Sequence, residues 1–565
     1  MDVPRTNAAA ERTHAGRTAE PVPFAPEPLP HAPEPLPLWM LFPLLFAAVY
    51  LCHITLLRLP YFWDEAGYYI PAAWDLFHTG TLIPQSTVTN AHPPLPSIVL
   101  AGWWRIAGFA PSATRTLVCM VAAAGLLGVY RMAQRLAGTA VAIATTLLTG
   151  LYPVWFAQST LAHADIFAAA FTLWGLSVYL EQDGLDGGQD GGRAGGRGCT
   201  VAAAVLFSLA ALSKETAVVT PGALAVFEGV LFWRVRRSAR ERRRHGSWMV
   251  ALASPVAPLS AWYAYHRHRT GFVFGNPEYL RYNATANLDA HRILLCLYHR
   301  LLHLTLHMNL FVPVLCAVAT LLVPRLRGAT RLRRRGFAAM AVVLGANWVA
   351  FSVLGGALLT RYLLPMYPLV LLVCVAEWAA RLPLRHWAWL AALSSAAFVT
   401  GAHVNPPYAF APEDNLTYRD FVVLHQQAVA VIAARYPEAT VLTAWPAFAE
   451  LERPELGYTK RAIKAVPIEN FSFEQIEHAA QDPGSYDTAL LFSTKWAPAR
   501  GAVDLAGGHR QADAKYFDFH EDMRPAVAAA MLHGEVVWQG SIRGEWAAVL
   551  RFPRVVEARL GRGPG

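Results

Sequence analysis

Two adjacent carboxylates, Asp64 and Glu65, stand among aromatic residues in the stretch YFWDEAGYY, residues 61–69. They follow a long apolar run, and a carboxylate in this position can accept a proton from a hydroxyl group as a general base. Asp64 also precedes an amphipathic stretch, residues 65–77, so a helix cap is the alternative explanation of the same residue. Capping and catalysis are compatible, and we expect Asp64 to act as a base.

Three charged residues later in the chain also stand at the ends of apolar stretches. They are Asp165 in LAHADIF, Lys214 in LSKET and Arg361 in LLTRY. Charged side chains at membrane depth are costly, so they indicate a functional site by default. Lys214 is the only lysine before Lys460, and an ammonium group suits a phosphate as a compact point charge. The alternative is a lysine whose head group snorkels from a helix end into water.

The composition indicates that a membrane positions these residues. Of the 565 residues, 55% are hydrophobic and 15% are charged, whereas soluble domains carry about 25% charged residues. The apolar residues come in blocks, and we expect an α-helical polytopic membrane protein with about 11 transmembrane helices in residues 38–402. The chain before them, residues 1–37, is polar and then proline-rich, which predicts a disordered cytoplasmic tail.

Two arginine-rich runs, residues 234–244 and 325–335, predict the orientation of the helices. Positive charge favours the cytoplasmic side, which accounts for the net charge of +9 without a nucleic-acid partner. Residues 58–94 and 267–300 then lie outside the membrane, the N-terminus inside, and the C-terminal part outside. We therefore expect a multi-pass protein of the bacterial inner-membrane type, with the charged helix ends described above on one face.

The apolar runs also predict where individual helices lie. Residues 95–130 are expected to form one interrupted crossing, because Pro111 breaks the run. Residues 164–181, 247–266 and 301–323 each predict one continuous span.

The last part of the chain, residues 403–565, has a different pattern. Residues 420–437 predict an amphipathic helix, and residues 440–446 and 488–496 predict strands. Residues 534–552 read as a hairpin. We expect this part to be an extracytoplasmic α/β domain.

The motif His-Pro-Pro-Leu at residues 92–95 makes the interpretation more specific. Proline fixes φ and suits the start of a helix. Together with DEAGYY at residues 64–69, this motif resembles the GT-C glycosyltransferases, the superfamily of the protein O-mannosyltransferases and aminoarabinose transferases. HADIF, SKE and RYLLPMYP support the resemblance, which extends over residues 38–402. The aminoarabinose transferases carry a lysine where this chain has His92, so His92 is nearer to the mannosyltransferase pattern.

The resemblance implies a polyprenyl-phosphate-linked sugar as donor and a lipid, polysaccharide or protein as acceptor. In the family, the acid of the first external loop acts at the acceptor hydroxyl, and that residue is Asp64 here. Cations must offset the charge of the departing phosphate. No cofactor is expected, and a divalent metal is compatible with the chemistry but not indicated, since a DxD sequence is absent. The candidates for binding the donor phosphate are Lys214, Arg361, His92 and Tyr362. Asp165 is a candidate second acid or a helix-end hydrogen-bonding group. Glu65 is a candidate for orienting the acceptor or the sugar.

A polytopic lipid or solute transporter or flippase is the alternative function. Transporters place charges near the middle of the membrane and often contain internal repeats. Here the charges stand at helix ends, and the two halves show no repeat. A non-catalytic relative that acts as an assembly partner is a third interpretation, against which the retained DE and HPPL motifs argue.

Overall fold

The computed structural model describes residues 37–87, 89, 92–181, 197–235, 238–275, 288–329, 332–354, 358–495, 510–517 and 520–552. The expected cytoplasmic tail before residue 37 and the centre of the expected external loop, residues 276–287, lie outside this part of the chain.

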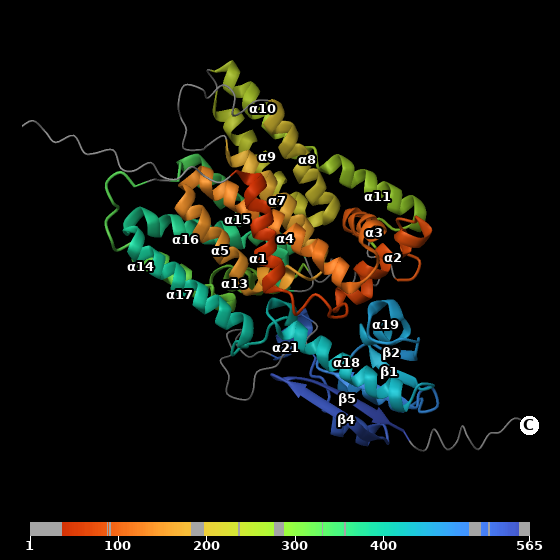
Figure 1. Ribbon diagram of the computed structural model, residues 1–565. Helices are drawn as coiled ribbons and strands as arrows, with labels where there is room; N and C mark the ends of the chain where they lie inside the picture. The colour runs from red at the N-terminus through yellow and green to blue at the C-terminus, as the bar shows by residue number, and fades with distance from the viewer. Residues whose placement is uncertain are drawn as a thin grey trace, which may run out of the picture. The chain divides into compact units, whose positions relative to one another are not determined.

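The described residues from Leu38 to His403 are helical almost throughout (Figure 1). The first helices are α1 (Leu38–Cys52), the π-helical turn η1 (Glu65–Tyr69), α2 (Ile70–Thr79), α3 (Leu95–Ala107), α4 (Pro111–Ala137), α5 (Thr139–Leu151), α6 (Pro153–Gln158), α7 (Ala164–Glu181) and α8 (Arg197–Ser213). They are followed by η2 (Glu215–Val218), α9 (Val219–Arg234), α10 (Ala239–Ala253), α11 (Val256–Thr270), α13 (Ala290–Thr305), η3 (His307–Asn309), α14 (Phe311–Thr320), α15 (Arg334–Val353), η4 (Thr360–Leu363), α16 (Tyr367–Arg381) and α17 (Leu384–His403).

Four helices of the described residues are long and apolar enough to cross a membrane, or five if one bent pair is a single span. Three further apolar helices are shorter. The membrane-spanning character is thus supported, but the expected count of about 11 spans is not confirmed. The expected helix at residues 164–181 is confirmed with both ends as predicted, since α7 runs from Ala164 to Glu181.

The expected interruption within residues 95–130 is present, because α3 and α4 are separate helices, but the expected single crossing is not confirmed, since α4 alone is long and apolar enough to span a membrane. The prediction of one continuous span at residues 247–266 is wrong. The chain forms α10 and α11 instead, and Pro255 stands between them. Proline lacks an amide proton and its ring clashes with the carbonyl group four residues earlier, so it ends the first helix.

The prediction of one continuous span at residues 301–323 is also wrong. The helices α13 and α14 meet at an angle of 97° across η3. Met308 and Asn309 have φ values of 47° and 65° at this bend, and residues in this conformation cannot continue a right-handed helix.

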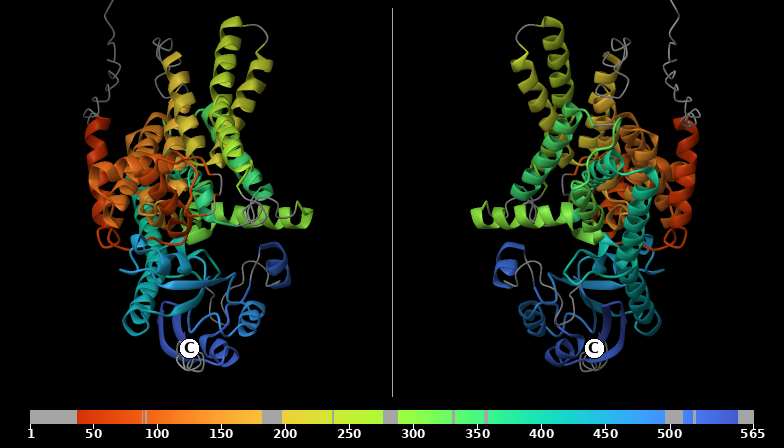
Figure 2. Two further views of the ribbon diagram at one scale, coloured as in Figure 1. Left: turned by 90° about the vertical axis from the view of Figure 1, so that its right-hand side faces the viewer. Right: turned by 90° about the vertical axis from the view of Figure 1, so that its left-hand side faces the viewer.

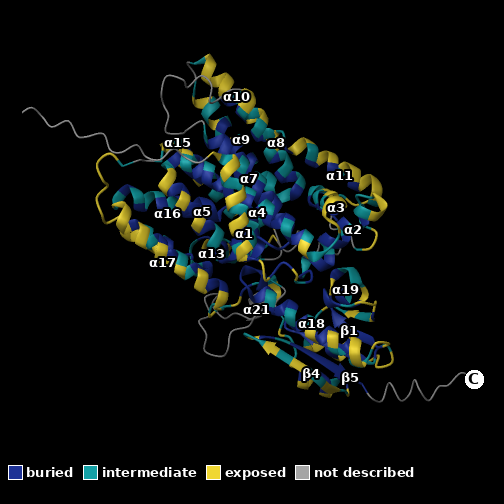
Figure 3. Ribbon diagram, viewed as in Figure 1, coloured by how far each residue is buried: buried dark blue, intermediate teal, exposed yellow. Residues whose placement is uncertain are grey.

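The helices differ in how much of their surface other parts of the protein cover. The apolar windows of α4 and α7 are 72% and 83% buried, whereas that of η2 and α9 is only 22% buried. Figure 3 shows the same contrast between the dark ribbons of α4 and α7 and the exposed side of α17. Large apolar side chains such as Trp233 and Trp389 are exposed, which suits lipid and is costly in water.

The described residues of the C-terminal part form a small mixed sheet with helices around it. The strand order is β2-β1-β3-β5-β4, in which β1 pairs in parallel with β2 and β3 while β5 pairs antiparallel with β3 and β4. The predicted helix, the two predicted strands and the predicted hairpin are all present, whereas β2 was not predicted. The elements are η5 (Pro412–Asp414), α18 (Thr417–Arg435), β1 (Thr440–Ala444), α19 (Ala447–Glu452), η6 (Pro454–Leu456), β2 (Lys464–Ile468), α20 (Phe473–Ala480), β3 (Thr488–Phe492), α21 (Arg510–Phe517), α22 (Pro525–Met531), β4 (Glu535–Ile542) and β5 (Glu545–Arg551).

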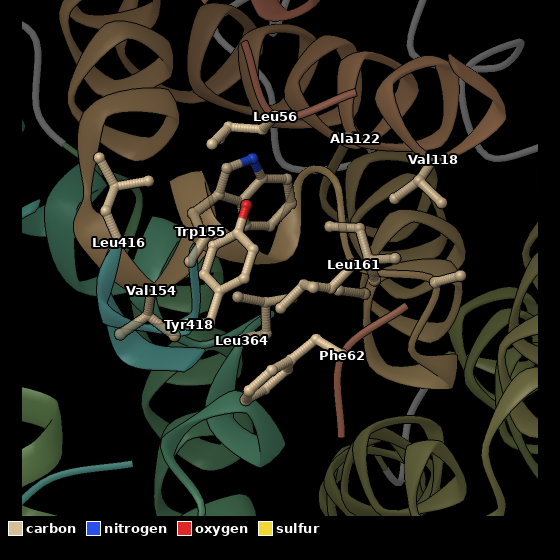
Figure 4. Packing of buried hydrophobic residues seen from close by; sticks show 14 of the residues in the cluster. Leu56, Phe62, Val118, Ala122, Val154, Trp155, Leu161, Leu364, Leu416 and Tyr418 are labelled. Atoms are coloured by element: carbon tan, nitrogen blue, oxygen red, sulfur yellow. The ribbon is translucent and has the colours of Figure 1, made fainter. Parts of the chain in front are cut away.

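The sheet and the helices share one buried apolar core within residues 38–565. Tyr418 at the start of α18 and Trp155 of α6 both belong to this core (Figure 4). The hydroxyl groups of Tyr418 and Thr160 lie 2.8 Å apart. The C-terminal part is therefore packed into the helical part through apolar contacts and hydrogen bonds. The predicted domain boundaries remain predictions.

Candidate active site

Arg361 lies at the centre of the charged residues. It belongs to η4, the short turn before α16, and its side chain is buried. Its guanidinium group donates hydrogen bonds to the carboxylates of Asp64 and Glu413. Its Nε also lies 3.5 Å from Oδ2 of Asp165. Three carboxylates from distant parts of the sequence thus surround a single arginine.

Lys214 joins this group through Asp165. Its Nζ donates a hydrogen bond of 2.6 Å to Oδ1 of Asp165. The lysine side chain is only 7% exposed, so it does not reach into water as a snorkelling lysine would. Nζ instead lies 4.0 Å from the ring centroid of Tyr362, and the guanidinium carbons of Arg300 and Arg361 lie 5.7 and 5.9 Å from the same centroid. Such placements over an aromatic face attract cations.

The structure therefore brings together most of the residues expected from the sequence. We name this group the charged cluster; it consists of Asp64, Asp165, Lys214, Arg361, Tyr362 and Glu413.

His92 lies next to the charged cluster. Its Nδ1 is 2.9 Å from Oε2 of Glu215, and Glu215 directly follows Lys214 in the chain. The ring of His92 also stacks on Tyr69, with 5.8 Å between centroids. The HPPL turn is thus joined to the lysine segment and to the turn that follows Asp64.

Asp64 does not act as a helix cap. It directly precedes η1, but its side chain makes no capping hydrogen bond and bonds to Arg361 instead. The element that follows is a single π-helical turn, and such turns are frequent at functional sites. The local structure favours a functional role for Asp64 over a capping role.

Glu65 points into the protein interior and is fully buried. Its carboxylate forms an ion pair with Arg115 at 3.2 Å and accepts hydrogen bonds from the backbone amides of Phe62 and Ala162, at 2.8 and 2.6 Å. A side chain with no exposed surface cannot touch a sugar in this conformation. The expected direct contact of Glu65 with acceptor or sugar does not fit this position, whereas anchoring of the segment that carries Asp64 does.

Sequence reasoning missed Glu413. Burial raises the pKa of this carboxyl to about 7, although Arg361 beside it acts in the opposite direction. Its neighbour Asp414 accepts hydrogen bonds from Thr360 and from His307, the latter at 2.9 Å. Two consecutive residues of η4 therefore bond to two consecutive residues of η5: Thr360 to Asp414, and Arg361 to Glu413. The only signal was the second pair of acids, ED at 413–414, at the start of the C-terminal part.

Among the residues that the structure describes, no group of three or more His, Cys, Asp or Glu side chains is placed to hold a metal ion. The carboxylates of the charged cluster contact cationic side chains instead.

The chain resembles known proteins in part of its sequence and in its fold. The family model of the dolichyl-phosphate-mannose-protein mannosyltransferases matches residues 91–262. The structure is similar to that of ArnT from Cupriavidus metallidurans in the apo state, with a TM-score of 0.53 and 14% identity over 90% of this chain and 97% of that chain. The same protein bound to undecaprenyl phosphate gives a TM-score of 0.51, with the same identity and coverage.

The expected resemblance to the GT-C glycosyltransferases is confirmed. The family match includes His92, Asp165 and Lys214 but neither Asp64 nor Arg361. The structure places Arg361 next to Asp165 of the matched region, and Asp64 contacts Arg361. No curated protein sequence matches the chain.

Proposed function

We propose that this protein is a membrane glycosyltransferase. It moves a sugar from a polyprenyl-phosphate donor to an acceptor hydroxyl group at the outer face of the membrane. The observation that carries this proposal is the charged cluster, in which a candidate base and two candidate phosphate ligands meet in a buried site. The ArnT structure bound to undecaprenyl phosphate supports a lipid phosphate as the carrier of the sugar.

Asp64 accepts the proton of the acceptor hydroxyl group as that oxygen bonds to the anomeric carbon. The bond between the anomeric carbon and the phosphate oxygen breaks, and the phosphate leaves on its lipid. Lys214 and Arg361 offset the charge that develops on the phosphate. Tyr362 and His92 line the phosphate side, and Asp165 holds Lys214 in place.

Arg361 has to exchange partners when the donor binds, since carboxylates occupy it in this structure. Glu413 is the carboxylate whose contact with Arg361 is lost most easily. Its raised pKa, about 7 through burial, means that it takes up a proton near neutral pH and then holds the guanidinium group less strongly. A phosphate can replace it as the charged partner.

The arrangement of α9 supports the proposed orientation in the membrane. Lys214 precedes the start of this helix, and the arginine-rich residues 234–244 begin at its other end. Figure 2 shows the adjoining ends of α9 and α10 on the side of the helices opposite the C-terminal strands. Positive charge favours the cytoplasmic side for the arginine-rich residues. The charged cluster and the C-terminal part, at the opposite end of the helices, are then expected on the outer side.

Sugar transfer by reconstituted protein tests the proposal. Wild type and Asp64→Asn are incubated in proteoliposomes with radiolabelled polyprenyl-phosphate sugars, both hexoses and pentoses, and an extract of membrane acceptors. The substitution keeps the size of the side chain and removes the base. We expect transfer to fall at least a hundredfold while the donor still binds. Asp482→Asn, at an exposed position, is the matched control and keeps full transfer.

Unchanged transfer by Asp64→Asn would remove Asp64 from the chemistry and leave Asp165 as the candidate base. Absence of transfer by wild type from every donor, together with movement of lipid or solute across the vesicle membrane, would replace the transferase by a transporter.

A further inference from the structure

A tryptophan from the C-terminal part lies against the segment that carries Asp64. Trp445 directly follows strand β1, and its indole ring packs on Gly67 in the π-helical turn η1. A Cβ atom on residue 67 would lie 2.4 Å from Nε1 of this ring. Any side chain there would displace the indole, so the contact depends on the glycine.

Two further aromatic side chains complete the contact: Trp63, directly before Asp64, and Tyr68, four residues after it. The ring centroid of Trp445 lies 5.0 Å from that of Trp63, nearly perpendicular to it, and 5.4 Å from that of Tyr68, at an angle of 35°. We name Trp63, Tyr68 and Trp445 the aromatic cluster. All three side chains are partly exposed, in contrast to the buried Phe421 beside them. Part of the surface of each of these three residues is therefore accessible to a ligand.

The backbone at Trp63 is strained. Its φ of 44° lies in the left-handed region that bulky residues rarely adopt. This conformation holds the ring of Trp63 against Trp445 while the next residue, Asp64, reaches Arg361. Strain of this kind is concentrated at functional sites, where the surrounding structure compensates for it. The aromatic cluster and the charged cluster thus meet at Asp64.

The two clusters suit different parts of the reactants. The phosphate of the donor suits Lys214 and Arg361, the two cations of the charged cluster, which both lie near the ring of Tyr362. The aromatic cluster contains no charged side chain, and a residue of the C-terminal part supplies one of its rings. A pyranose ring matches such a surface, because its C–H face packs on an aromatic ring while its hydroxyl groups stay free for Asp64. The serine or threonine side chain that carries the hydroxyl group of a peptide acceptor has no such ring face.

We propose that the aromatic cluster is the acceptor subsite and that the acceptor is a saccharide whose pyranose ring stacks on Trp445. This inference rests on the proposed transferase function and selects, from the acceptor classes, those that contain sugar rings. A glycolipid and a polysaccharide share this chemistry. The C-terminal part then determines the choice of acceptor, because it provides Trp445.

Binding without turnover is the first test. The full-length protein in lipid nanodiscs is mixed with a panel of methyl pyranosides, and saturation-transfer NMR detects contact with their C–H groups. Open-chain hexitols, which carry hydroxyl groups but no ring face, serve as control ligands. We expect signals from at least one pyranoside and none from the hexitols. Trp445→Ala should weaken binding about tenfold, as expected for the loss of one stacking ring, and Trp445→Phe should restore most of it.

Two further variants separate stacking from folding. Gly67→Ala keeps Trp445 but displaces its ring, so it should weaken pyranoside binding as Trp445→Ala does. Phe473→Ala removes an exposed aromatic side chain of helix α20, in the same part of the protein, and should leave binding unchanged. Equal signals from pyranosides and hexitols, or pyranoside binding that survives both Trp445→Ala and Gly67→Ala, would overturn the proposal.

Transfer kinetics give the second test. Trp445→Ala should raise the KM for a saccharide acceptor about tenfold and leave the donor KM and the kcat at saturating acceptor unchanged. Lower kcat with unchanged acceptor KM would show that Trp445 only supports the fold, and transfer to serine-containing peptides alone would reject a saccharide acceptor. A glycolipid head group and a soluble oligosaccharide, tested in parallel, distinguish the two sources. The NMR result stands even if wild type shows no transfer, so failure of the proposed function remains separate.

Discussion

Lys214 and Asp165 illustrate how single residues can be structural and functional at once. Their contact is short, and both side chains are almost inaccessible to water. Two buried opposite charges stabilise each other, because loss of one partner leaves the other charge buried and uncompensated. An inactive Lys214 variant alone would therefore say little about the reaction. A double substitution separates the two roles.

We expect Lys214→Met to abolish sugar transfer and to destabilise the protein by about 3 kcal/mol, the cost of breaking a buried ion pair. Replacing both partners, with Lys214→Met and Asp165→Asn together, should recover most of the thermal stability but no transfer. Melting temperatures in nanodiscs and the transfer assay provide the two readouts. Transfer that returns along with stability in the double variant would show that Lys214 has only a structural role.

The elements that hold this ion pair pack closely because of a glycine. Asp165 lies in the first turn of α7, and Lys214 follows the end of α8. Between these helices, a Cβ atom on Gly175 would lie 2.8 Å from the ring of Phe207. Small residues at such crossings let the backbones of membrane helices approach each other. The distance between the charged residues thus depends on a contact in the helix interiors.

Substitution of Gly175 by valine should force α7 and α8 apart, because overpacking a tight contact costs about 1–3 kcal/mol. We expect a lower melting temperature and reduced transfer. Phe207→Ala in the same chain makes room for the new side chain and should restore part of both. Gly222→Val, at a position with open space around it, is the matched control. If Gly222→Val is as harmful as Gly175→Val, the close contact is not the cause.

Several elements of the fold follow from sequence pattern, and others do not. The apolar run at 164–181 is bounded by polar residues at both ends, so its helix could be located correctly. The same reasoning failed at 247–266 and 301–323, since hydropathy averages over a run and does not register a proline such as Pro255 or two residues with positive φ.

The candidate site could likewise be predicted only in part from the sequence. Asp64, Asp165, Lys214 and Arg361 could be assigned to one face because hydropathy and arginine-rich loops predict which helix ends lie together. The role of Glu413 depends on the docking of the C-terminal part, and an acid outside the apolar runs looks like an ordinary surface residue. Trp445 was missed for the same reason.

At the scale of the whole molecule, the main feature is that the C-terminal part forms hydrogen bonds with the segments around Asp64. Tyr458 donates a hydrogen bond of 2.9 Å to the backbone carbonyl of Tyr61, and Arg453 donates one of 3.2 Å to Ser86. The segment with Asp64 is held from the other side by Glu65 and Arg115. Loss of structure in the C-terminal part should therefore reach the active site directly.

The stability of the C-terminal part should depend on pH through Glu545 at the start of β5. Burial raises the pKa of this carboxyl to about 7, with Ser493 donating a hydrogen bond to it and Asp522 and Asp420 nearby. An unfolded glutamate has a pKa of about 4.3. Between these two values the folded state binds more protons than the unfolded state, so stability falls as pH rises.

We expect the melting temperature of the wild type to decrease from pH 5 to pH 8, with a loss of at most about 3 kcal/mol from this group. Glu545→Gln cannot ionise and should remove the part of this decrease that Glu545 causes, while Glu413, whose pKa is also raised to about 7, keeps its own part. Glu535→Gln, at an exposed position on β4, should leave it unchanged. Scanning fluorimetry of the full-length protein at several pH values measures the effect. An identical pH slope in Glu545→Gln and wild type would assign the dependence to other groups.

The contact of Trp445 with Gly67 also bears on the order of synthesis. The ribosome completes the Asp64 segment early, but Glu413, Trp445 and Tyr458 emerge only after all the membrane helices. At ordinary rates of translation this interval lasts on the order of tens of seconds. During it, the nascent chain lacks the residues of the C-terminal part that contact Arg361 and Gly67. Premature termination in that interval yields a fragment without these contacts, and we expect such a fragment to be inactive in the proposed sugar transfer.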